Sequence, residues 1–352
     1  MRIIFTWILA ILALVVWVVT VVSLIHSDLW WIQVLDFPRL LLLIAIAVLA
    51  IGCAAFTRRG WRIGLLILLT VAAALQAWRM YPYSGIAPTE VADAEEVGVG
   101  LGASCFTVLG LNVLQDNRDY AATRALIDRE RPDILLLMET DQRWVDELGA
   151  SLANYPSRLL RPLDNTYGLV FATTLPVQSA TTVNITDLDT PTVYARLTTR
   201  DGQSFDYIGL HPRPPAPGQD TTLRDRKIAQ AALHVADHEV PAIAMGDFND
   251  VPWSRTTRLF RQVGGYLDPR IGRGSYPSFP ATVAPIGWPL DQLFLSPDFT
   301  FRSLRILENV GSDHRPLAAE VCLIGQAARR ANAAPDDVDP EALKAARSLA
   351  EQ

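Results

Sequence analysis

The sequence predicts an α/β domain that follows a group of apolar helices near the N-terminus. Half of the 352 residues are apolar, but nearly all the long apolar runs lie in residues 1–81. Beyond residue 102, short apolar runs typical of buried strands alternate with segments of helical periodicity. Several of these runs end in one polar side chain, which predicts a functional site along an edge of the sheet.

Residues 1–81 are predicted to form a transmembrane anchor. Residues 3–25 carry no charge, and about 20 apolar residues are enough to cross the hydrocarbon core as a helix. This stretch is longer than the apolar part of a cleaved signal peptide. Residues 40–56 and 63–78 are shorter runs, which we interpret as a second and a third span. The alternative for these two runs is a buried helical hairpin in a soluble domain.

The loops between the runs predict their orientation. Three arginines separate the second run from the third, namely Arg58, Arg59 and Arg62. The first loop instead contains Asp28 and Asp36, with only Arg39. Because positively charged loops stay in the cytoplasm, we expect a multi-pass protein of the inner (plasma) membrane whose main domain is extracytoplasmic, or periplasmic. If the third run does not span, this orientation reverses.

The remaining chain divides into three parts. Residues 82–102 are interpreted as a linker, residues 103–325 as the main domain, and the Ala-rich residues 326–352 as a loose tail with one weak helix. Residues 1–81 hold six arginines and two aspartates, so residues 82–352 carry 25 basic and 35 acidic side chains, a net charge of −10. This domain therefore has no overall basic field that would attract nucleic acid, although a local basic groove remains possible.

The main domain is expected to alternate strands and helices. A helix should begin at Asn117 or Asp119 and end near residue 129, and a second should cover residues 223–235. The basic side chains Arg224, Arg226 and Lys227 of the second helix are interpreted as facing solvent. The expected strands that bear on the site are 105–114, 133–138, 207–210, 242–245, 290–296 and 316–323.

Polar side chains gather at the ends of these strands. They are Asn112, Glu139, His211, Asp247, Asn249, Asp291, Asp313 and His314. Clustered carboxylates repel one another unless a cation neutralises them, and oxygen ligands favour Mg²⁺, Mn²⁺ or Ca²⁺ over zinc. A metal ion together with a histidine base and amide donors suits the attack of water on a phosphate ester.

The order of these motifs resembles the endonuclease/exonuclease/phosphatase superfamily, which includes deoxyribonucleases, sphingomyelinases and inositol-polyphosphate phosphatases. The resemblance covers about residues 103–323. Its motifs are Asn112, Met138-Glu139, His211, Gly246-Asp247-Phe248-Asn249, Asp291 and Ser312-Asp313-His314-Arg315-Pro316. The resemblance implies a four-layer α/β/β/α sandwich with two packed mixed sheets, and a hydrolase that acts on ester bonds.

The same resemblance implies a role for each residue. Glu139 would bind Mg²⁺ or Mn²⁺, with Asn112 assisting and Asp313 close by. Asp247 would orient the attacking water and Asn249 would contact the phosphoryl oxygen. His314, held by Asp291, would be the base or the transition-state stabiliser. His211 would contact the scissile phosphate or help the leaving group.

These residues predict a metal-dependent phosphoesterase tethered to a membrane. Its substrate would be a phosphodiester or phosphomonoester in a nucleic acid, a lipid headgroup or a small molecule. The lipid bilayer is the other expected partner, and no protein partner is expected. Two alternatives remain, namely a sphingomyelinase-like lipid-headgroup phosphodiesterase and a catalytically silent membrane-bound binding module.

The resemblance also bears on the cysteines. The chain has three, Cys53, Cys105 and Cys322, and no CxxC pair, so a structural zinc site is not expected. In this family the first and last strands are antiparallel neighbours. Cys105 lies seven residues before Asn112 and Cys322 eight residues after His314, so both thiols lie at a similar distance from the site. We expect a disulfide between them; the alternative is two buried free thiols.

Overall fold

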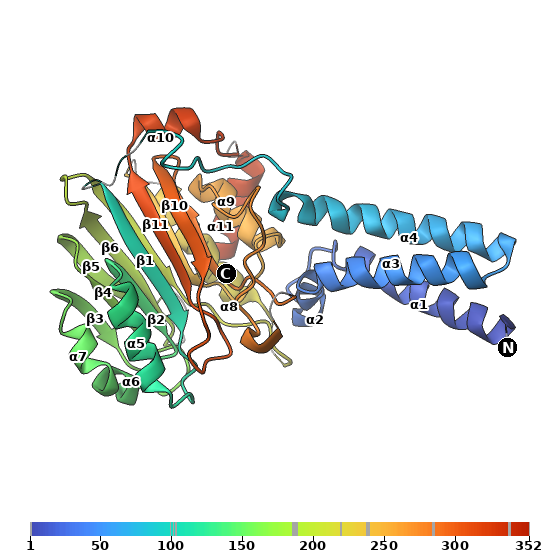
Figure 1. Ribbon diagram of the computed structural model, residues 1–352, viewed down its shortest axis with the longest axis horizontal. Helices are drawn as coiled ribbons and strands as arrows, with labels where there is room; N and C mark the ends of the chain where they lie inside the picture. The colour runs from blue at the N-terminus through green and yellow to red at the C-terminus, as the bar shows by residue number, and fades with distance from the viewer. Residues whose placement is uncertain are drawn as a thin grey trace.

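The computed structural model describes residues 2–98, 100, 102, 104–184, 189–218, 220–236, 240–283, 286–336 and 339–351. A rod of three long helices projects from a β-rich body (Figure 1). The rod lies at the N-terminal end of the chain, and the helix that ends the chain packs within the body.

The rod consists of α1 (Arg2–Val22), α3 (Arg39–Phe56) and α4 (Arg59–Met80). All three helices are long and apolar enough to span a membrane. Their facing sides are packed together through Ala13, Cys53 and Leu69, whereas large apolar side chains remain exposed on the outer surface. α4 has 22 residues and begins four residues before the predicted start at residue 63. It is therefore long enough to cross the hydrocarbon core of a bilayer.

The body contains two mixed sheets. One has six strands in the order β10-β11-β1-β2-β4-β3, and the other has five in the order β5-β6-β7-β8-β9. β1 pairs in parallel with β2, and β7 with β8, while the remaining neighbours are antiparallel. The strands of the first sheet are β1 Cys105–Asn112, β2 Ile134–Met138, β3 Ser157–Arg161, β4 Leu169–Thr173, β10 Phe299–Ile306 and β11 Leu317–Leu323. Those of the second are β5 Val177–Asn184, β6 Pro191–Thr198, β7 Ser204–Leu210, β8 Ala242–Asp247 and β9 Asp291–Leu295.

Side-chain alternation along the strands explains the layers. In β2, Ile134, Leu136 and Met138 face the opposite sheet, whereas Leu135 and Leu137 face helices. The helices over the first sheet are α5 Tyr120–Glu130, α6 Gln142–Glu147 and α7 Gly149–Leu152. Those over the second are α8 Thr222–Ala236, α9 Arg255–Gly264 and α11 Pro340–Glu351. The predicted four-layer α/β/β/α sandwich is confirmed.

Helix α5 settles the choice left open at its N-terminus. Asp119 is the N-cap, and its carboxylate accepts a hydrogen bond from the Ala122 backbone N–H at 3.1 Å. Asn117 lies just before the cap, and its side-chain amide donates to the backbone oxygens of Val113 and Val310.

Two segments are more ordered than the sequence predicts. The tail expected to be loose forms α10 (Gln326–Ala331) and α11, and α11 buries Ala342 and Ala346 against α8 and α9. The segment thus has two helices rather than one weak helix, and it is not loose, because the small side chains of α11 let it pack closely although they carry little hydrophobic signal of their own. In the expected linker, Val91 lies in the core between the sheets and Glu90 forms an ion pair with Arg261.

The cysteine prediction is confirmed in full. β1 and β11 are antiparallel neighbours, Cys105 lies opposite Cys322, and the two form a disulfide. Cys53 remains free and buried in the helical rod.

Candidate active site

Asp247, the last residue of β8, lies at the centre of a polar cluster. Its Oδ2 accepts a hydrogen bond from Asn112 Nδ2 at 3.2 Å. The same oxygen lies 3.8 Å from His211 Nε2 and 3.5 Å from His314 Nε2. These neighbours follow from topology, because the parallel pairs β1–β2 and β7–β8 end at one edge while β9 and the last strand β11 begin there. All four side chains are buried.

Glu139 joins this cluster from the end of β2. Its Oε1 accepts a hydrogen bond from Asn112 Nδ2 at 2.8 Å and lies 4.0 Å from His211 Nε2. Glu139 adopts a positive φ of 61°, an uncommon backbone conformation that costs energy and persists only where the surroundings enforce it. Burial raises the pKa of Glu139, and the nearby Asp247 carboxylate raises it further, while the Asn112 hydrogen bond opposes them.

His314 is oriented by a buried carboxylate. Its Nδ1 lies 2.7 Å from Asp291 Oδ2, and the Asp291 backbone N–H donates to the Ser278 hydroxyl. Burial lowers the pKa of His314, but the charges of Asp291 and Asp247 outweigh burial and raise it to about 10. The Phe279 ring covers the imidazole, with ring centres 4.8 Å apart. His314 is therefore fixed with Nε2 directed at Asp247.

His211 lies in the opposite electrostatic environment. Burial lowers its pKa to about 4, so its imidazole is neutral at physiological pH. Its Nδ1 is buried and has no hydrogen-bond partner within the described residues. The Tyr167 ring lies 5.3 Å from the imidazole, and the Arg213 guanidinium lies over that Tyr167 ring at 5.5 Å. Tyr167 and Arg213 are neighbours of the site that the sequence alone did not predict.

Asn249 shapes the loop that follows Asp247. Its backbone N–H donates to Asp247 Oδ1 at 2.8 Å, and its side-chain amide donates to the Pro212 backbone oxygen at 2.9 Å. Asn249 has a positive φ of 49°, which asparagine tolerates better than most residues. In this geometry Asn249 joins the loop after β8 to the residue that follows His211.

Asp313 lies apart from the other predicted metal ligands. Its carboxylate accepts a hydrogen bond from the Ser312 hydroxyl at 3.4 Å, and its charge contributes to the raised pKa of His314. Within the described residues it makes no hydrogen bond or ion pair with Glu139 or Asn112. The structure thus brings together seven of the eight predicted residues by direct contacts and leaves Asp313 beside His314.

The donor set at Glu139 fits a magnesium-type ion. Among the described residues, no group of three or more histidine, cysteine, aspartate or glutamate side chains could hold a metal on its own. Mg²⁺ does not need such a group, because it keeps several waters and commonly uses one or two carboxylates together with substrate phosphate. Glu139 and Asp247 are two carboxylates that share a single amide donor, an arrangement that a cation would stabilise. An oxygen ligand from Asn112 would require the opposite amide orientation, since its Oδ1 accepts from the Leu114 N–H.

The sequence did not predict a buried network of basic side chains behind the site. Arg224 and Lys227 on α8 are each 1% exposed, so their assignment to a solvent-facing surface was wrong. Lys227 Nζ donates to the backbone oxygen of His211 at 3.0 Å, and Arg224 donates to that of Asn249 at 3.4 Å. Burial lowers the pKa of Lys227 to about 7. No local signal identifies these residues, because distant segments bury them.

The loop between α1 and α3 completes this network. It contains α2 (Trp30–Gln33) and a short 3₁₀ turn, Val34–Asp36. Gln33 Nε2 donates to Thr221 Oγ1 at 2.9 Å and to Asp225 Oδ2 at 3.1 Å, and Gln33 Oε1 accepts a short hydrogen bond from Arg224. The loop between the first two apolar helices therefore packs directly behind the Asp247–Asn249 loop.

Comparison with known proteins agrees with this fold. Residues 108–314 match the family model described as "Endonuclease/Exonuclease/phosphatase family", and the chain belongs to that family. The predicted enzyme class, a hydrolase acting on ester bonds, is confirmed at this level. None of the curated proteins matches the sequence significantly.

Solved structures show the same fold. A humanized D. rerio TDP2 is 14% identical and gives a TM-score of 0.51, with 62% of this chain and 99% of that chain covered. A Bacteroides thetaiotaomicron mannosyl-6-phosphatase is 16% identical with a TM-score of 0.51, and 61% of this chain and 99% of that one are covered. D. rerio TDP2 complexed with a single-strand DNA product is 16% identical, also with a TM-score of 0.51, over 62% of this chain and 99% of that chain. At such identities the likeness establishes the fold alone.

Proposed function

We propose that this protein is a membrane-tethered phosphoesterase that uses Mg²⁺ or Mn²⁺ to direct water at the phosphorus of a phosphodiester or phosphomonoester. The observation that carries the proposal is the convergence on Asp247 Oδ2 of Asn112, His211 and His314, with Glu139 sharing the Asn112 amide. Asp247, His211 and His314 are buried and Glu139 is partly buried, and placing ionisable side chains together in the interior is costly, so such clusters are typical of functional sites.

Each residue has a role that its position supports. Glu139, assisted by Asn112 and Asp313, would hold the metal, which supplies charge stabilisation at the phosphoryl oxygens. Asp247 would accept a hydrogen bond from the attacking water and orient it. His314, positively charged and fixed by Asp291, would stabilise negative charge next to Asp247. The neutral His211 would contact the phosphate or the leaving oxygen, and Asn249 would hold the loop and offer its amide to the phosphoryl group.

The test uses the full chain purified in detergent, with bis(p-nitrophenyl) phosphate and p-nitrophenyl phosphate as probes. Hydrolysis should require Mg²⁺ or Mn²⁺ and stop in EDTA. Asp247→Asn, Glu139→Gln and His314→Ala should each lower kcat/KM by at least about 100-fold, because each removes a different role. Asp146→Asn, on the exposed face of α6, is the matched control and should keep wild-type activity. Unchanged hydrolysis in EDTA, or in all three variants, would overturn the proposal.

The membrane tether is part of the same proposal. Three helices with apolar outer surfaces support it, and the arginine-rich turn at residues 58–62 supports an inner-membrane topology with the hydrolase domain on the extracytoplasmic, periplasmic side. The Cys105–Cys322 disulfide is consistent with that side, because such bonds persist in oxidising compartments.

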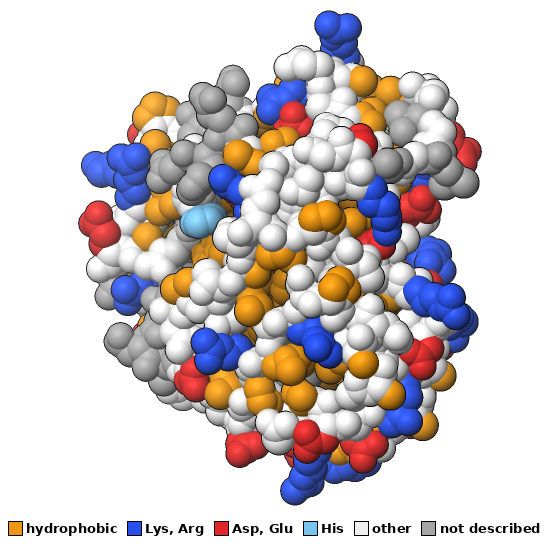
Figure 2. All heavy atoms as spheres, turned by 90° about the vertical axis from the view of Figure 1, so that its left-hand side faces the viewer, with side chains coloured by type: hydrophobic (Ala, Val, Ile, Leu, Met, Phe, Trp, Pro, Cys, Tyr) orange, Lys and Arg blue, Asp and Glu red, His pale blue; other side chains and the backbone are white. Residues whose placement is uncertain are grey.

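One observation favours a lipid headgroup as substrate. Phe279, which covers His314, belongs to the apolar cluster that also contains Phe37 of the α1–α3 loop. The site therefore lies close to the level at which two candidate spans end. Lysine and arginine side chains are interspersed with acidic ones on the face shown in Figure 2, which gives no basic track for a long nucleic acid there.

Competing substrates can decide this second point. The full chain in nanodiscs should hydrolyse a phospholipid or sphingomyelin headgroup at higher kcat/KM than a duplex DNA, and its binding to DNA should weaken steeply with salt. Efficient duplex cleavage at physiological salt would instead identify a nuclease. Neither result alters the metal-dependence test above.

A further inference from the structure

We propose that a second site, separate from the hydrolytic centre, binds the phosphate of an anionic phospholipid headgroup. It is a cavity of about 80 Å³ between the end of α1, the end of α4 and the start of α9. Four of its lining side chains are basic or can become so, namely His26, Arg79, Arg255 and Arg258. The volume holds a few water molecules, which is the size of one phosphate group rather than of acyl chains.

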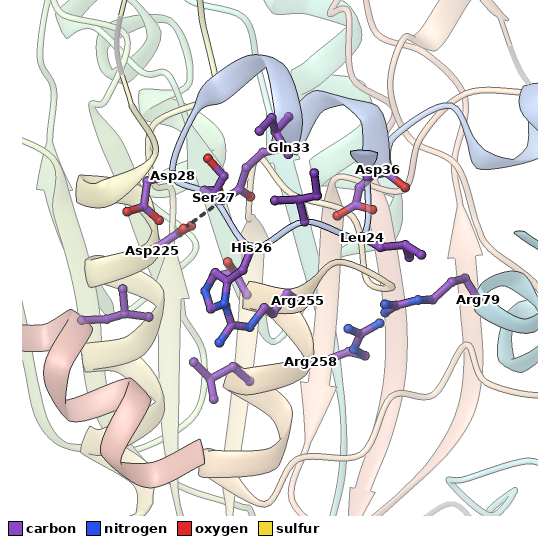
Figure 3. Close-up of a pocket in the computed structure, with 16 residues that line it drawn as sticks. Leu24, His26, Ser27, Asp28, Gln33, Asp36, Arg79, Asp225, Arg255 and Arg258 are labelled. Atoms are coloured by element: carbon purple, nitrogen blue, oxygen red, sulfur yellow. Dashed lines mark hydrogen bonds between the residues drawn. The ribbon is translucent and has the colours of Figure 1, made fainter. Parts of the chain in front are cut away.

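The basic groups come from three separate elements and face one cavity. Figure 3 shows the guanidinium groups of Arg79 and Arg258 directed toward each other, with Arg255 and His26 further along the same cavity. Like charges so placed repel unless an anion lies between them. The structure therefore holds an arrangement of cations that an anion would stabilise.

Few protein groups satisfy these cations. Within the described residues, His26 and Arg255 have no hydrogen-bond or ion-pair partner. In the described part of the chain, the Arg258 guanidinium donates only to the Trp253 backbone oxygen, at 2.9 Å. Arg79 contacts the Trp78 ring, and its buried Nε lacks a hydrogen-bond partner among those residues. Most of the guanidinium donors thus remain available to a ligand.

The acidic side chains of the same cavity are largely engaged elsewhere. Asp36 forms an ion pair with Arg39, and Asp225 pairs with Arg224 and accepts from Gln33. Asp28 lies at the far end, beside Asp225, as Figure 3 shows. The end formed by Arg79, Arg255 and Arg258 therefore keeps a net positive charge.

The position of the cavity selects a lipid as the ligand, and this step rests on the proposed membrane tether. Arg79 lies in the last turn of α4, and His26 lies four residues after the end of α1, so both lie where two candidate spans leave the bilayer. Exposed Trp31 and Trp78 lie at the same ends, where aromatic rings favour the headgroup zone. Arginine forks match phosphate oxygens, and the three of them would repel the cationic part of a zwitterionic headgroup.

The experiment measures thermal unfolding of the full chain in detergent, with EDTA present so that no hydrolysis contributes. Short-chain phosphatidylglycerol should raise the unfolding temperature, and short-chain phosphatidylcholine should do so far less. In Arg255→Gln/Arg258→Gln, the phosphatidylglycerol concentration for half-maximal stabilisation should rise at least tenfold, with an intermediate change in Arg255→Gln. The matched control, Arg143→Gln/Arg330→Gln, changes two exposed arginines outside the cavity and should respond as wild type.

Three outcomes would overturn the proposal. A wild-type response in the double variant would show that the arginines do not bind the lipid. Equal stabilisation by phosphatidylcholine would remove the selectivity for an anionic headgroup. If millimolar inorganic phosphate reproduced the whole effect and phosphatidylglycerol added nothing, the ligand would be free phosphate. The catalytic function is tested separately, by the loss of bis(p-nitrophenyl) phosphate hydrolysis in EDTA. A failure of lipid binding can therefore be told apart from a failure of the proposed catalytic function.

Discussion

At the residue scale, backbone conformation decides where the carboxylate of Asp247 points. Gly246, the residue before it, has a φ of +149°, and a Cβ built there would lie 1.9 Å from the Leu210 backbone oxygen. β7 and β8 pair in parallel at this point, with Leu210 opposite Gly246. Glycine is therefore required for the close approach of the two strands that deliver His211 and Asp247 to one edge.

Replacing Gly246 should be more harmful than replacing another glycine of positive φ. Gly265 also has a positive φ, of 63°, but a Cβ there meets nothing within 4 Å. Gly265→Ala should cost about 1 kcal/mol of unfolding free energy from the backbone conformation alone. Gly246→Ala adds a backbone clash, so it should cost at least about 3 kcal/mol and abolish activity. Equal unfolding temperatures for the two variants would contradict the steric argument.

At the element scale, the α1–α3 loop is part of the hydrolase domain rather than a simple connection. Trp253 Nε1 donates to the Asp36 backbone oxygen at 2.7 Å, and the Thr221 backbone N–H donates to the Asp28 backbone oxygen at 2.9 Å. Gln33 adds the side-chain bonds that satisfy Arg224 and Asp225 in the interior. Hydrogen bonds through this loop therefore connect the helical rod to the residues that support the site.

Cutting the coupling at Gln33 should destabilise the domain. In Gln33→Leu, the buried Arg224 and Asp225 each lose a hydrogen bond, which should cost about 1–3 kcal/mol. The unfolding temperature should fall by several degrees, and turnover of bis(p-nitrophenyl) phosphate should fall because the Asn249 loop loses support. The control is Gln142→Leu, since Gln142 is exposed and, among the residues that the structure describes, its side chain bonds only to Asp146 on its own helix. If both variants matched wild type, the loop would not support the site.

The disulfide between the first and last strands is testable by counting thiols. Denatured, non-reduced full-length protein should give one free thiol per chain, from Cys53, and Cys53→Ser should give none. Reduction should yield three thiols in the wild type. The bond closes a loop with a sequence separation of 217, so reducing it should lower the free energy of unfolding by up to about 5 kcal/mol. Three free thiols without reductant would reject the bond.

At the scale of the whole molecule, the apolar rod and the acidic body predict a protein held at a bilayer surface. The rod exposes large apolar side chains on its outer faces, whereas the body buries its apolar residues between and beneath the two sheets. Water would not solvate such a rod well, and lipid would. In that case the rod would hold the hydrolytic centre near the bilayer surface.

A reporter fusion tests that topology. Alkaline phosphatase fused after residue 90 should be active, because three spans with the proposed orientation would place this point outside the cytoplasm. A green fluorescent reporter fused after residue 59 should fluoresce, because the arginine-rich turn should be cytoplasmic. The opposite pattern at both points would reverse the orientation, and would leave the disulfide in a reducing compartment.

The sequence by itself determined the layers and most of the site. The layers came with the resemblance of the motifs. Ile134 to Met138 is apolar throughout, so the sequence predicts a buried strand there, and only the structure shows which of its side chains face the other sheet. The polar residues at the strand ends, from Asn112 to His314, were predicted as site residues because parallel strands end at a common edge. The order of the motifs then supplied the family, and with it the pairing of Cys105 and Cys322.

Only the tertiary structure decided which distant segments cover one another. Arg224 and Lys227 look solvent-facing on a helix, yet a loop from residues 26–38 and the chain near His211 bury them. The tail beyond residue 326 is predicted to be loose with one weak helix, yet α11 packs against α8 and α9. Local spacing determines which face of an element is apolar or charged. The partner of that face is set by long-range packing, because burying a charge or a small-residue stripe is favourable only where a matching surface exists.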